Sequence, residues 1–332
     1  MIPQAKVSIF IPLYNAEKYI AASIESVLHQ TFTDWELLIL DDCSTDQSFK
    51  IAKAFEERDR RIKVKRNAQN LGMMGNWNEG IRQCTSEYFV KLDADDVWHP
   101  QMLEKAIPIL NTQAEVALVF TRYLNIDVNG NQIPDSAIEL PDFAQNRSFS
   151  CVPLVQNGNF LAYSILRQGL SVMRRKVFDE IGLYRHLLTP ETQASTDTEF
   201  YFRVGCHYLI YCLDEILYYY RVHTSSISAT DKSRDLQEKK MYEIKYCIIE
   251  YYYSNNKINK YQRRLMLNNA KLDYQTYLIY KRRKERKYLK MLFLLLKLFL
   301  RFPAQAFSFY FRRLFEGLLL FLLIILYIAN IT

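Results

Sequence analysis

Short apolar runs alternate with helix-like segments over the first part of the chain. The runs are continuous and rich in β-branched residues, which is typical of strands that are buried on both faces. They occupy residues 7–11, 35–40, 62–65 and 88–92. Apolar residues at helical spacing separate them, over residues 17–30, from residue 46 onward and over residues 76–83. This alternation predicts βαβ units and an α/β fold with a mostly parallel sheet.

Between residues 100 and 230 the pattern predicts further strands and helices with longer connections. The predicted strands are residues 116–123, 169–173, 208–213 and 216–221, and the predicted helices are residues 101–111, 176–182 and 196–205. Asn129 and Gly130 favour a hairpin turn within residues 126–132. Residues 134–159 have little periodicity, and we interpret them as an excursion from the regular pattern.

The chain changes character near residue 230, where long helices dense in Tyr, Lys and Arg begin. We therefore predict a domain of residues 1–230 followed by a helical extension of residues 231–332. A basic run at residues 281–287 precedes apolar segments with interspersed cations, and the last apolar run covers only residues 317–328. A membrane-spanning helix needs about 20 apolar residues, so helices that lie in the membrane surface are favoured over a span.

Polar side chains follow three of the predicted strands at the points where these strands end. Pro12, Tyr14 and Asn15 follow the first strand, Asp41 and Asp42 the second, and Asp93, Asp95 and Asp96 the fourth. Because ligands gather at the carboxyl ends of parallel strands, we expect the three groups to share one edge of the sheet. The carboxylate cluster is unfavourable without a counter-charge and predicts a hard divalent cation, with solvated helix-capping aspartates as the alternative.

The usual phosphate-binding loops are absent from the sequence. Neither a G-x-G-x-x-G loop after the first strand nor a P-loop lysine motif is present. A nucleotide bound at this edge would need its phosphates neutralised in another way. A metal ion on the acidic cluster can do this.

Charge and cysteine spacing restrict the partners and the compartment. The net charge is +7, but the basic residues cluster beside the apolar C-terminal segments and no nucleic-acid-binding motif is present, which favours a membrane surface over nucleic acid. The six cysteines have no metal-like or C-x-x-C spacing, so we expect buried reduced thiols. The N-terminal apolar run is too short for a signal-peptide core. These features predict a catalytic domain at the cytoplasmic face of the cell membrane.

Several ordered motifs resemble those of the family 2 glycosyltransferases, which have the GT-A fold. They are V-S-I-F-I-P-L-Y-N at residues 7–15, S-V-L-H-Q-T at 26–31, W-E-L-L-I-L-D-D-C-S-T-D at 35–46, N-x-G at 70–72, L-D-A-D-D at 92–96, T-D-T-E-F at 196–200 and Y-R-V-H at 220–223. The resemblance covers residues 6–228 and is far more specific than an isolated D-x-D pair. It implies a Rossmann-like sheet flanked by helices and a nucleotide-sugar donor, with UDP as the expected nucleotide.

The resemblance also implies roles for individual residues. Those implied to bind the nucleotide sugar are Pro12, Tyr14, Glu17, Asp42, Asn70, Asn76, Asp93, Ala94 and Arg221. Those implied to bind Mn²⁺ or Mg²⁺ are Asp95, Asp93 and His223. A polar surface position is the alternative for His223, and a structural ion pair is the alternative for Arg221. The catalytic base maps to Asp197, with Glu199 as its neighbour, and a helix cap is the alternative for Asp197.

These roles describe a single displacement with inversion at the anomeric carbon. A divalent ion stabilises charge on the departing diphosphate, while a carboxylate accepts the proton of a hydroxyl group that attacks from the opposite face. Two departures from the family pattern bear on this expectation: Thr196 stands where Glu is usual, and Cys43 stands where Gly is commoner. The first weakens any role that needs the missing Glu and leaves Asp197 intact.

We therefore expect a non-processive, inverting glycosyltransferase that acts on a glycan or lipid-linked acceptor in cell-surface polysaccharide synthesis. A processive synthase is disfavoured, because neither several apolar spans nor a Q-x-x-R-W motif is present. A non-catalytic nucleotide-sugar-binding protein or a membrane scaffold is the alternative. The sequence leaves open the donor sugar, the linkage and the formation of a homo-oligomer.

Overall fold

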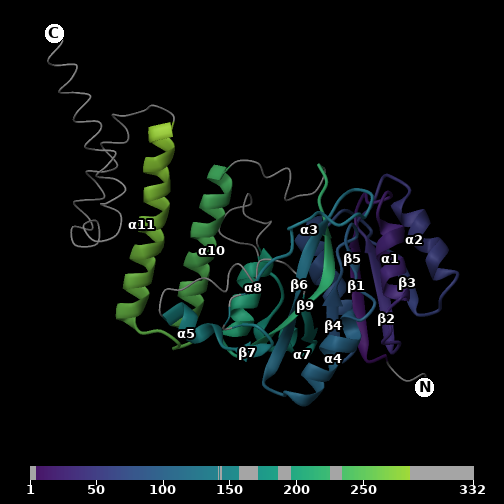
Figure 1. The fold of residues 1–332 in the computed structure, drawn as a ribbon, viewed down its shortest axis with the longest axis horizontal. Helices are drawn as coiled ribbons and strands as arrows, with labels where there is room; N and C mark the ends of the chain where they lie inside the picture. The colour runs from purple at the N-terminus through teal and green to yellow at the C-terminus, as the bar shows by residue number, and fades with distance from the viewer. Residues whose placement is uncertain are drawn as a thin grey trace, which may run out of the picture. The chain divides into compact units, whose positions relative to one another are not determined.

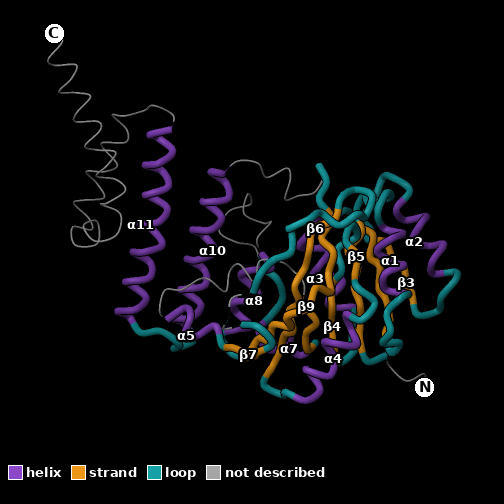
Figure 2. Tube along the Cα trace, viewed as in Figure 1, coloured by secondary structure: helices purple, strands orange, loops and turns teal. Residues whose placement is uncertain are grey.

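The computed structural model describes residues 5–140, 142, 144–156, 171–185, 196–224 and 234–284 (Figure 1). The chain divides into two compact units, Met1–Met266 and Leu267–Thr332. The first unit carries the sheet, and Figure 2 shows its strands among the surrounding helices. The predicted membrane-surface segments lie beyond residue 284 and thus outside the described residues. Within the described ranges, no helix is long and apolar enough to cross a membrane.

Strands and helices alternate along the first unit, which confirms the α/β fold class. The strands are β1 (Val7–Leu13), β2 (Trp35–Asp41), β3 (Ile62–Arg66), β4 (Tyr88–Lys91), β5 (Val97–Trp98), β6 (Val116–Ile126), β7 (Arg147–Phe149), β8 (Ser171–Arg174) and β9 (Leu209–Arg221). The helices are α1 (Ile20–Leu28), α2 (Ser48–Glu56), α3 (Gly72–Gln83), α4 (Met102–Thr112), α5 (Cys151–Gln156), α7 (Lys176–Ile181), α8 (Thr196–Gly205), α10 (Arg234–Ser254) and α11 (Lys260–Lys284).

In the described part of the chain, the strands form a 9-stranded sheet with the order β3-β2-β1-β4-β8-β6-β9-β5, and β7 pairs with β9. The pairs β1–β2, β1–β4 and β2–β3 are parallel, as the βαβ pattern predicts. β8 is antiparallel to both β4 and β6, and β9 is parallel to β6 but antiparallel to β5 and β7. The sheet is therefore parallel around β1 and mixed beyond β4.

Alternate side chains of the central strands pack against helices on opposite faces of the sheet. Ile9 and Ile11 of β1 belong to one core cluster with Ile24 of α1 and with residues of α2 and α4. Phe10 points to the other face, where its ring lies against Gly80 of α3. A Cβ atom at position 80 would lie 2.2 Å from that ring, so the close approach requires glycine. Helices thus cover both faces, and the strand ends remain as the accessible edge.

β1 continues through Pro12 to Leu13, whereas the sequence predicts that Pro12 ends the strand. The reason is the short length of β4. Phe10 is the last β1 residue that pairs with β4, so the missing N–H of Pro12 lies beyond the ladder on that side. On the other side, the Leu13 carbonyl accepts a hydrogen bond from the Asp42 N–H at 2.8 Å, and pairing with β2 continues.

β9 is a single strand, although the sequence predicts two. Asp214 and Glu215 lie where the register between β9 and β6 shifts, next to Arg122 of β6. Arg122 Nη1 lies 3.2 Å from Asp214 Oδ1, and Lys105 Nζ lies 3.2 Å from Glu215 Oε1. The two acidic residues that interrupt the apolar pattern are thus accommodated at an irregularity inside one strand.

Some elements begin earlier than predicted or are not predicted at all. α3 begins at Gly72, ahead of the predicted start near Asn76, because the Leu71 N–H donates to Asp42 Oδ1 at 2.8 Å and fixes the first turn against the end of β2. The short elements β5, β7 and α5 have 2, 3 and 6 residues. Such short segments contain too few positions for a periodic pattern to be recognised.

α10 belongs to the first compact unit. Tyr252 of α10 is fully buried, and its hydroxyl donates to the Phe202 carbonyl of α8 at 2.9 Å. Ile244 and Ile248 on the same helix are also buried. The helix therefore packs on the sheet-bearing unit. The predicted domain boundary near residue 230 stays a prediction, since it falls in residues 225–233, outside the described residues.

Candidate active site

The residues that follow β1, β2 and β4 emerge at one edge of the sheet, here called the rim. β1 pairs in parallel register with β2 up to Leu13 and with β4 up to Phe10, so the three strands end close together. The Ala94 carbonyl accepts a hydrogen bond from the Ser23 hydroxyl of α1 at 2.9 Å. This bond fastens residues 93–96, here called the acidic loop, to α1.

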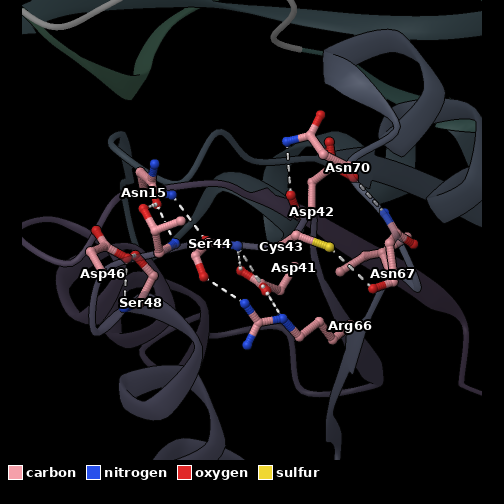
Figure 3. Close-up of polar contacts among 12 residues, drawn as sticks. Asn15, Asp41, Asp42, Cys43, Ser44, Asp46, Ser48, Arg66, Asn67 and Asn70 are labelled. Atoms are coloured by element: carbon pink, nitrogen blue, oxygen red, sulfur yellow. Dashed lines mark hydrogen bonds and ion pairs between the residues drawn. The ribbon is translucent and has the colours of Figure 1, made fainter.

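Asp41 is fully buried and shapes the backbone of the rim (Figure 3). Its carboxylate accepts a hydrogen bond from the Ser44 N–H at 3.2 Å and forms an ion pair with Arg66 Nε at 3.1 Å. The Arg66 guanidinium also donates to the Ser44 carbonyl at 2.5 Å. Asp41 is thus a structural residue that holds the loop after β2 against the end of β3.

The backbone conformation at position 43 accounts for the glycine that is commoner there in the family. The Cys43 φ of 64° lies in the left-handed region, which glycine adopts without strain and other residues adopt at a cost of about 1–2 kcal/mol. The Cys43 thiol donates to the Asn67 carbonyl at 3.3 Å (Figure 3). This contact partly offsets the strain and ties the loop after β2 to the loop after β3.

Asp42 connects the predicted donor-binding residues of the rim. Its Oδ1 accepts a hydrogen bond from Asn67 Nδ2 at 2.8 Å, and its carbonyl accepts one from Asn70 Nδ2 at 3.0 Å (Figure 3). Asn67 Nδ2 also donates to Asn76 Oδ1 at 3.0 Å, and Asn76 Nδ2 donates to the Leu40 carbonyl at 3.0 Å. The structure therefore brings Asp42, Asn70 and Asn76 together. Asn67, a loop residue outside every motif, is the member that the sequence does not single out.

The loop after β1 presents an aromatic ring at the rim. Tyr14 is 53% exposed. Asn15 Oδ1 accepts a hydrogen bond from the Thr45 N–H at 2.7 Å, and Glu17 Oε2 accepts one from the Gln47 N–H at 2.9 Å. Glu17 thus has a structural bond to the segment before α2. These bonds hold the loop while the Tyr14 ring faces solvent, where it can stack on a planar base.

Asp95 and His223 converge at the rim. Asp95 Oδ2 lies 2.9 Å from His223 Nε2, and the His223 ring packs on Tyr19 with a centroid distance of 4.8 Å. Burial and the negative charge of Asp93 raise the pKa of Asp95, while the contact with His223 opposes this change. A carboxylate and an imidazole from strand ends far apart in the sequence therefore lie side by side.

Asp96 and Arg221 hold the acidic loop on β9. The buried Asp96 carboxylate accepts hydrogen bonds from the Tyr218 hydroxyl at 2.5 Å and from the Arg221 N–H at 2.7 Å. Burial and the neighbouring carboxylates raise its pKa well above the usual range. The Arg221 guanidinium donates to the carbonyls of Asp95 at 2.7 Å and Asp127 at 3.0 Å. These contacts give Arg221 a structural function, and its predicted role in donor binding stays a prediction.

Asp93 is paired with a lysine that the sequence does not single out. Lys91 Nζ forms an ion pair with Asp93 Oδ1 and lies 4.1 Å from the centroid of the Trp77 ring. Lys91 is buried although it is charged, whereas the Asp93 side chain is 36% exposed. The cue in the sequence is a cation within the otherwise uncharged β4, two positions before the first aspartate of the acidic loop.

Asp197 lies in the first turn of α8. Its Oδ1 accepts a hydrogen bond from the adjacent Thr198 N–H at 2.7 Å, which differs from an N-cap bond to a residue two or three positions further on. Burial raises the pKa of Asp197 to about 6, the positive charge of Lys91 opposes this rise, and Asp93 adds to it. Ring contacts connect α8 to the acidic loop: Phe200 of α8 packs on Tyr184 at a centroid distance of 4.6 Å, Tyr184 packs on Trp77 at 5.3 Å, and Lys91, the partner of Asp93, lies over Trp77. A carboxylate that is ionised at neutral pH yet binds a proton readily suits a general base.

Glu199 is committed to an ion pair and is not available as a base. Arg203 Nε lies 2.8 Å from Glu199 Oε1, and both side chains are almost fully buried. The Arg203 guanidinium also donates to the carbonyls of Ile181 and Leu183, each at 2.7 Å. Glu199 and Arg203 therefore hold α8, and with it Asp197, against the segment that follows α7.

The residues of the acidic loop fit a divalent ion that binds together with a phosphate-bearing ligand. Among the described residues, no three His, Cys, Asp or Glu side chains are arranged to hold a metal. Asp95 and His223 already lie together, while Asp93 is paired with Lys91. Metal ions in nucleotide-dependent enzymes use one or two carboxylates and complete their shell with phosphate oxygens and water. Carboxylate suits Mg²⁺ and Mn²⁺, and imidazole is a common ligand of transition metals.

A model of the protein family described as glycosyl transferase family 2 matches residues 8–182. The chain belongs to glycosyl transferase family 2. The matched segment covers more than half of the chain, contains the rim and the acidic loop, and ends before α8 and Asp197. The match confirms the family resemblance for the motifs within residues 8–182 and identifies a family 2 glycosyltransferase domain, while the motifs at residues 196–200 and 220–223 follow the matched segment.

Bacterial relatives in the family align with much of the chain. The Bacillus subtilis protein EpsE, which is named as a glycosyltransferase, is 32% identical over 183 residues, or 54% of this chain and 65% of EpsE. Escherichia coli WfgD, a UDP-Glc:alpha-D-GlcNAc-diphosphoundecaprenol beta-1,3-glucosyltransferase, is 33% identical over 159 residues, or 47% of this chain and 61% of WfgD. The chain thus spans less than two thirds of the length of these two relatives.

Two solved structures share the fold of this family 2 chain. Residues 1–349 of TarS from S. aureus, in complex with UDP-GlcNAc, have a TM-score of 0.60 at 18% identity and cover 82% of this chain and 73% of that one. The mannosyltransferase PcManGT from Pyrobaculum calidifontis, in complex with GDP-Man and Mn²⁺, has a TM-score of 0.53 at 14% identity and covers 97% of this chain and 81% of that one. These similarities support the GT-A fold.

Proposed function

We propose that this enzyme is a non-processive, inverting, metal-dependent transferase that moves a sugar from a UDP-sugar to a hydroxyl group of a glycan or lipid-linked acceptor in cell-surface polysaccharide synthesis. The observation that supports this most is the chain of ring contacts from α8, which carries Asp197, through Tyr184 and Trp77 to Lys91 and the acidic loop. The helix that carries a group able to accept a proton is therefore connected to the residues suited to a cation and a diphosphate. A single displacement needs these two functions close together.

Different residues of the rim are suited to different parts of the nucleotide sugar. The exposed Tyr14 ring can stack on the base of the nucleotide, and the hydrogen-bonded cluster of Asp42, Asn67, Asn70 and Asn76 would fix the backbone around its polar edge. Asp95, His223 and Asp93 would hold Mn²⁺ or Mg²⁺ beside the diphosphate. When bound, such an ion stabilises the negative charge of the departing nucleoside diphosphate as a Lewis acid.

Asp197 is the group that receives the proton. As the acceptor oxygen attacks the anomeric carbon and the bond to the diphosphate breaks, the acceptor hydroxyl group loses its proton to the ionised Asp197 carboxylate. The nearby Lys91 favours the ionised form before the reaction. One attack from the face opposite the leaving group inverts the anomeric carbon.

The relatives support the classes of donor and acceptor. WfgD is named for transfer of glucose from UDP-Glc to a sugar on diphosphoundecaprenol, and a TarS structure contains UDP-GlcNAc. PcManGT was solved with GDP-Man and Mn²⁺, so the nucleotide has to be tested. We propose the cytoplasmic face of the cell membrane as the location, because a lipid-linked acceptor lies there and the C-terminal sequence suits a membrane surface.

Release of nucleoside diphosphate by the full chain tests this function. The panel contains UDP-glucose, UDP-GlcNAc, UDP-galactose and GDP-mannose, each with Mn²⁺ and with EDTA. We expect hydrolysis or binding of a UDP-sugar that depends on Mn²⁺. Absence of both turnover and binding for every donor would contradict an enzymatic function of this kind, and equal turnover in EDTA would contradict metal dependence.

The variant D197N tests the base. The amide keeps the shape of the side chain but does not take up the proton, so we expect a loss of about 100-fold or more in kcat, with Mn²⁺ affinity unchanged. D179N is the matched control, because Asp179 lies in the first turn of α7 and is largely exposed. Full activity of D197N would exclude Asp197 as the base.

A further inference from the structure

Lys91 is an unusual residue for its position in the fold. It is the last residue of β4, and only 4% of it is exposed to solvent. Tyr88 and Val90 on the same strand belong to the core with α1, α2 and α4, whereas the ring of Phe89 contacts Phe178 of α7. Lys91 follows the alternation of Phe89 and lies on that second face, against Trp77 of α3.

The Lys91 ammonium is paired with one carboxylate and lies against one aromatic ring. It is paired with Asp93, it lies over the Trp77 ring at 4.1 Å, and its charge acts on Asp197. Trp77 is itself held by an edge contact with Tyr184, at a centroid distance of 5.3 Å. Burying an ammonium group is unfavourable by several kcal/mol unless opposite charges compensate, and here Asp93 and Asp197 provide that compensation.

Lys91 is neither a predicted metal ligand nor the proposed catalytic base, so neither role accounts for a lysine at this position. A strand residue at this place needs only to fill space, as Phe89 does. The divalent ion expected on the acidic loop would compete with Lys91 for Asp93, because both are cations drawn to the same carboxylate. Lys91 therefore contacts the acidic loop through Asp93, and its other neighbour, Trp77, is connected through Tyr184 to Phe200 of α8, the helix that carries Asp197.

We propose that Lys91 is a positioning residue that serves both carboxylates: it neutralises Asp93 before a divalent ion binds and remains beside Asp197 when the ion has taken Asp93. This inference rests on the proposed function. In the metal-free protein the ammonium keeps the acidic loop in its folded arrangement. With the donor bound it holds Asp197 ionised and directed at the acceptor hydroxyl group.

The charged groups around Asp197 determine in which direction its pKa changes when Lys91 is removed. Lys91 and Asp93 act on it from the end of β4, Thr198 donates to it within α8, and the phenols of Tyr184 and Tyr201 lie near it as neutral groups. Lys91 is the cation among these groups. Its removal takes away the charge that favours the ionised base, and it also removes a repulsion that opposes binding of a divalent ion.

Mn²⁺ binding to the protein alone is the first test. We compare wild type with K91M, which keeps the length of the side chain without its charge, and with K91R, which keeps the charge. Lys105 pairs with Glu215 at the surface, so K105M is the matched control. We expect K91M to bind Mn²⁺ about 3- to 10-fold more tightly, measured by calorimetry or electron paramagnetic resonance, and K91R and K105M to resemble wild type. Equal or weaker binding by K91M overturns the proposal.

The second test is catalytic and uses the UDP-sugar that the wild-type enzyme hydrolyses. We expect K91M to lower kcat about 10-fold or more with little change in KM, and to move the acid limb of the pH profile to higher pH, while K91R restores both. A structural role alone would not move the acid limb. The proposal is overturned if folded K91M has an unchanged kcat and an unchanged acid limb of the pH profile. If K91M does not fold, K91Q is measured in the same way. If no donor is hydrolysed or bound, the proposed function fails, and the Mn²⁺ measurement still decides on Lys91.

Discussion

At the scale of single residues, the carboxylates of the rim and its surroundings have different tasks because their partners differ. Asp41 and Asp96 are buried and fully engaged by donors from neighbouring strands and loops. Asp95 and Asp93 each keep about a third of the side chain exposed. Asp197 is the carboxylate with a pKa of about 6. Adjacent aspartates in one motif thus separate into buried structural groups and partly exposed groups that we propose bind the metal ion.

The pKa of Asp197 predicts the pH dependence of transfer. Its pKa is raised to about 6, and the base acts only when it is ionised, so activity should fall as the pH drops through 6 and stay level above it. The measurement is kcat/KM for hydrolysis of the UDP-sugar between pH 5 and pH 8, where the acid limb should have a slope of one. The limb should be absent from the residual activity of D197N. An identical limb in D197N would assign it to another group.

His223 should contribute to metal binding. Its Nε2 lies 2.9 Å from Asp95 Oδ2, and the Tyr19 ring holds the imidazole in place. H223A should therefore weaken Mn²⁺ binding about 10-fold and leave the free energy of unfolding nearly unchanged. The control is H207A, since His207 lies at an exposed position beside Tyr251. Wild-type Mn²⁺ affinity in H223A would favour the alternative of a surface histidine.

At the scale of elements, α8 carries the proposed base and is held by the buried Arg203. Arg203 joins Glu199 on its own helix to the carbonyls of Ile181 and Leu183. The segment after α7 is also paired with α3, because Asn78 Nδ2 donates to the Tyr184 carbonyl at 3.0 Å and Asn78 Oδ1 accepts from the Tyr184 N–H at 3.1 Å. α3 begins at Gly72, directly after Leu71, whose N–H donates to Asp42, so one helix connects the Asp42 end of the rim to the segment that supports α8.

Removal of the buried arginine should destabilise the protein. R203M leaves the Glu199 carboxylate and two carbonyls without their donor in a buried site, and we expect a loss of about 3 kcal/mol in the free energy of unfolding, measured by urea denaturation. R82M removes an exposed arginine that pairs with Glu79 on α3, and it should have little effect. Equal urea midpoints for R203M and R82M would show that the buried Arg203–Glu199 pair adds nothing to the free energy of unfolding.

The sequence predicts those features of the fold and the site that depend on local pattern. Apolar runs bounded by polar residues correctly indicate β1 to β4, and the order of the motifs places their ends at one rim. The burial of Lys91 is not predictable in this way, because Trp77, on which its ammonium lies, belongs to a different element, α3. The same holds for Asn67, whose bonds to Asp42 and Asn76 form only when the loops after β2 and β3 meet helix α3. The sequence wrongly predicts two strands in place of β9, because Asp214 and Glu215 interrupt its apolar pattern and their pairing with cations on β6 and α4 is not visible in the sequence.

At the scale of the whole molecule, attachment to a membrane is the remaining proposal. Residues 281–287 are basic and the residues after 290 are largely apolar, although they lie outside the described residues beyond Lys284. The full chain should therefore sediment with vesicles that contain phosphatidylglycerol, and a chain that ends at residue 280 should not. Vesicles of phosphatidylcholine alone should bind the full chain less, since they lack the anionic charge. Undiminished binding by the shortened chain would refute this anchor.

The outer strand β3 has a consequence for assembly. It is the end of the described sheet beside β2, and its residues Lys63 and Lys65 are exposed. Cations along an outer strand repel the same strand of a second copy and keep its unpaired backbone groups in water. Two copies of this enzyme are therefore not expected to join their sheets edge to edge at β3, and the rim would stay open to donors and acceptors at high protein concentration.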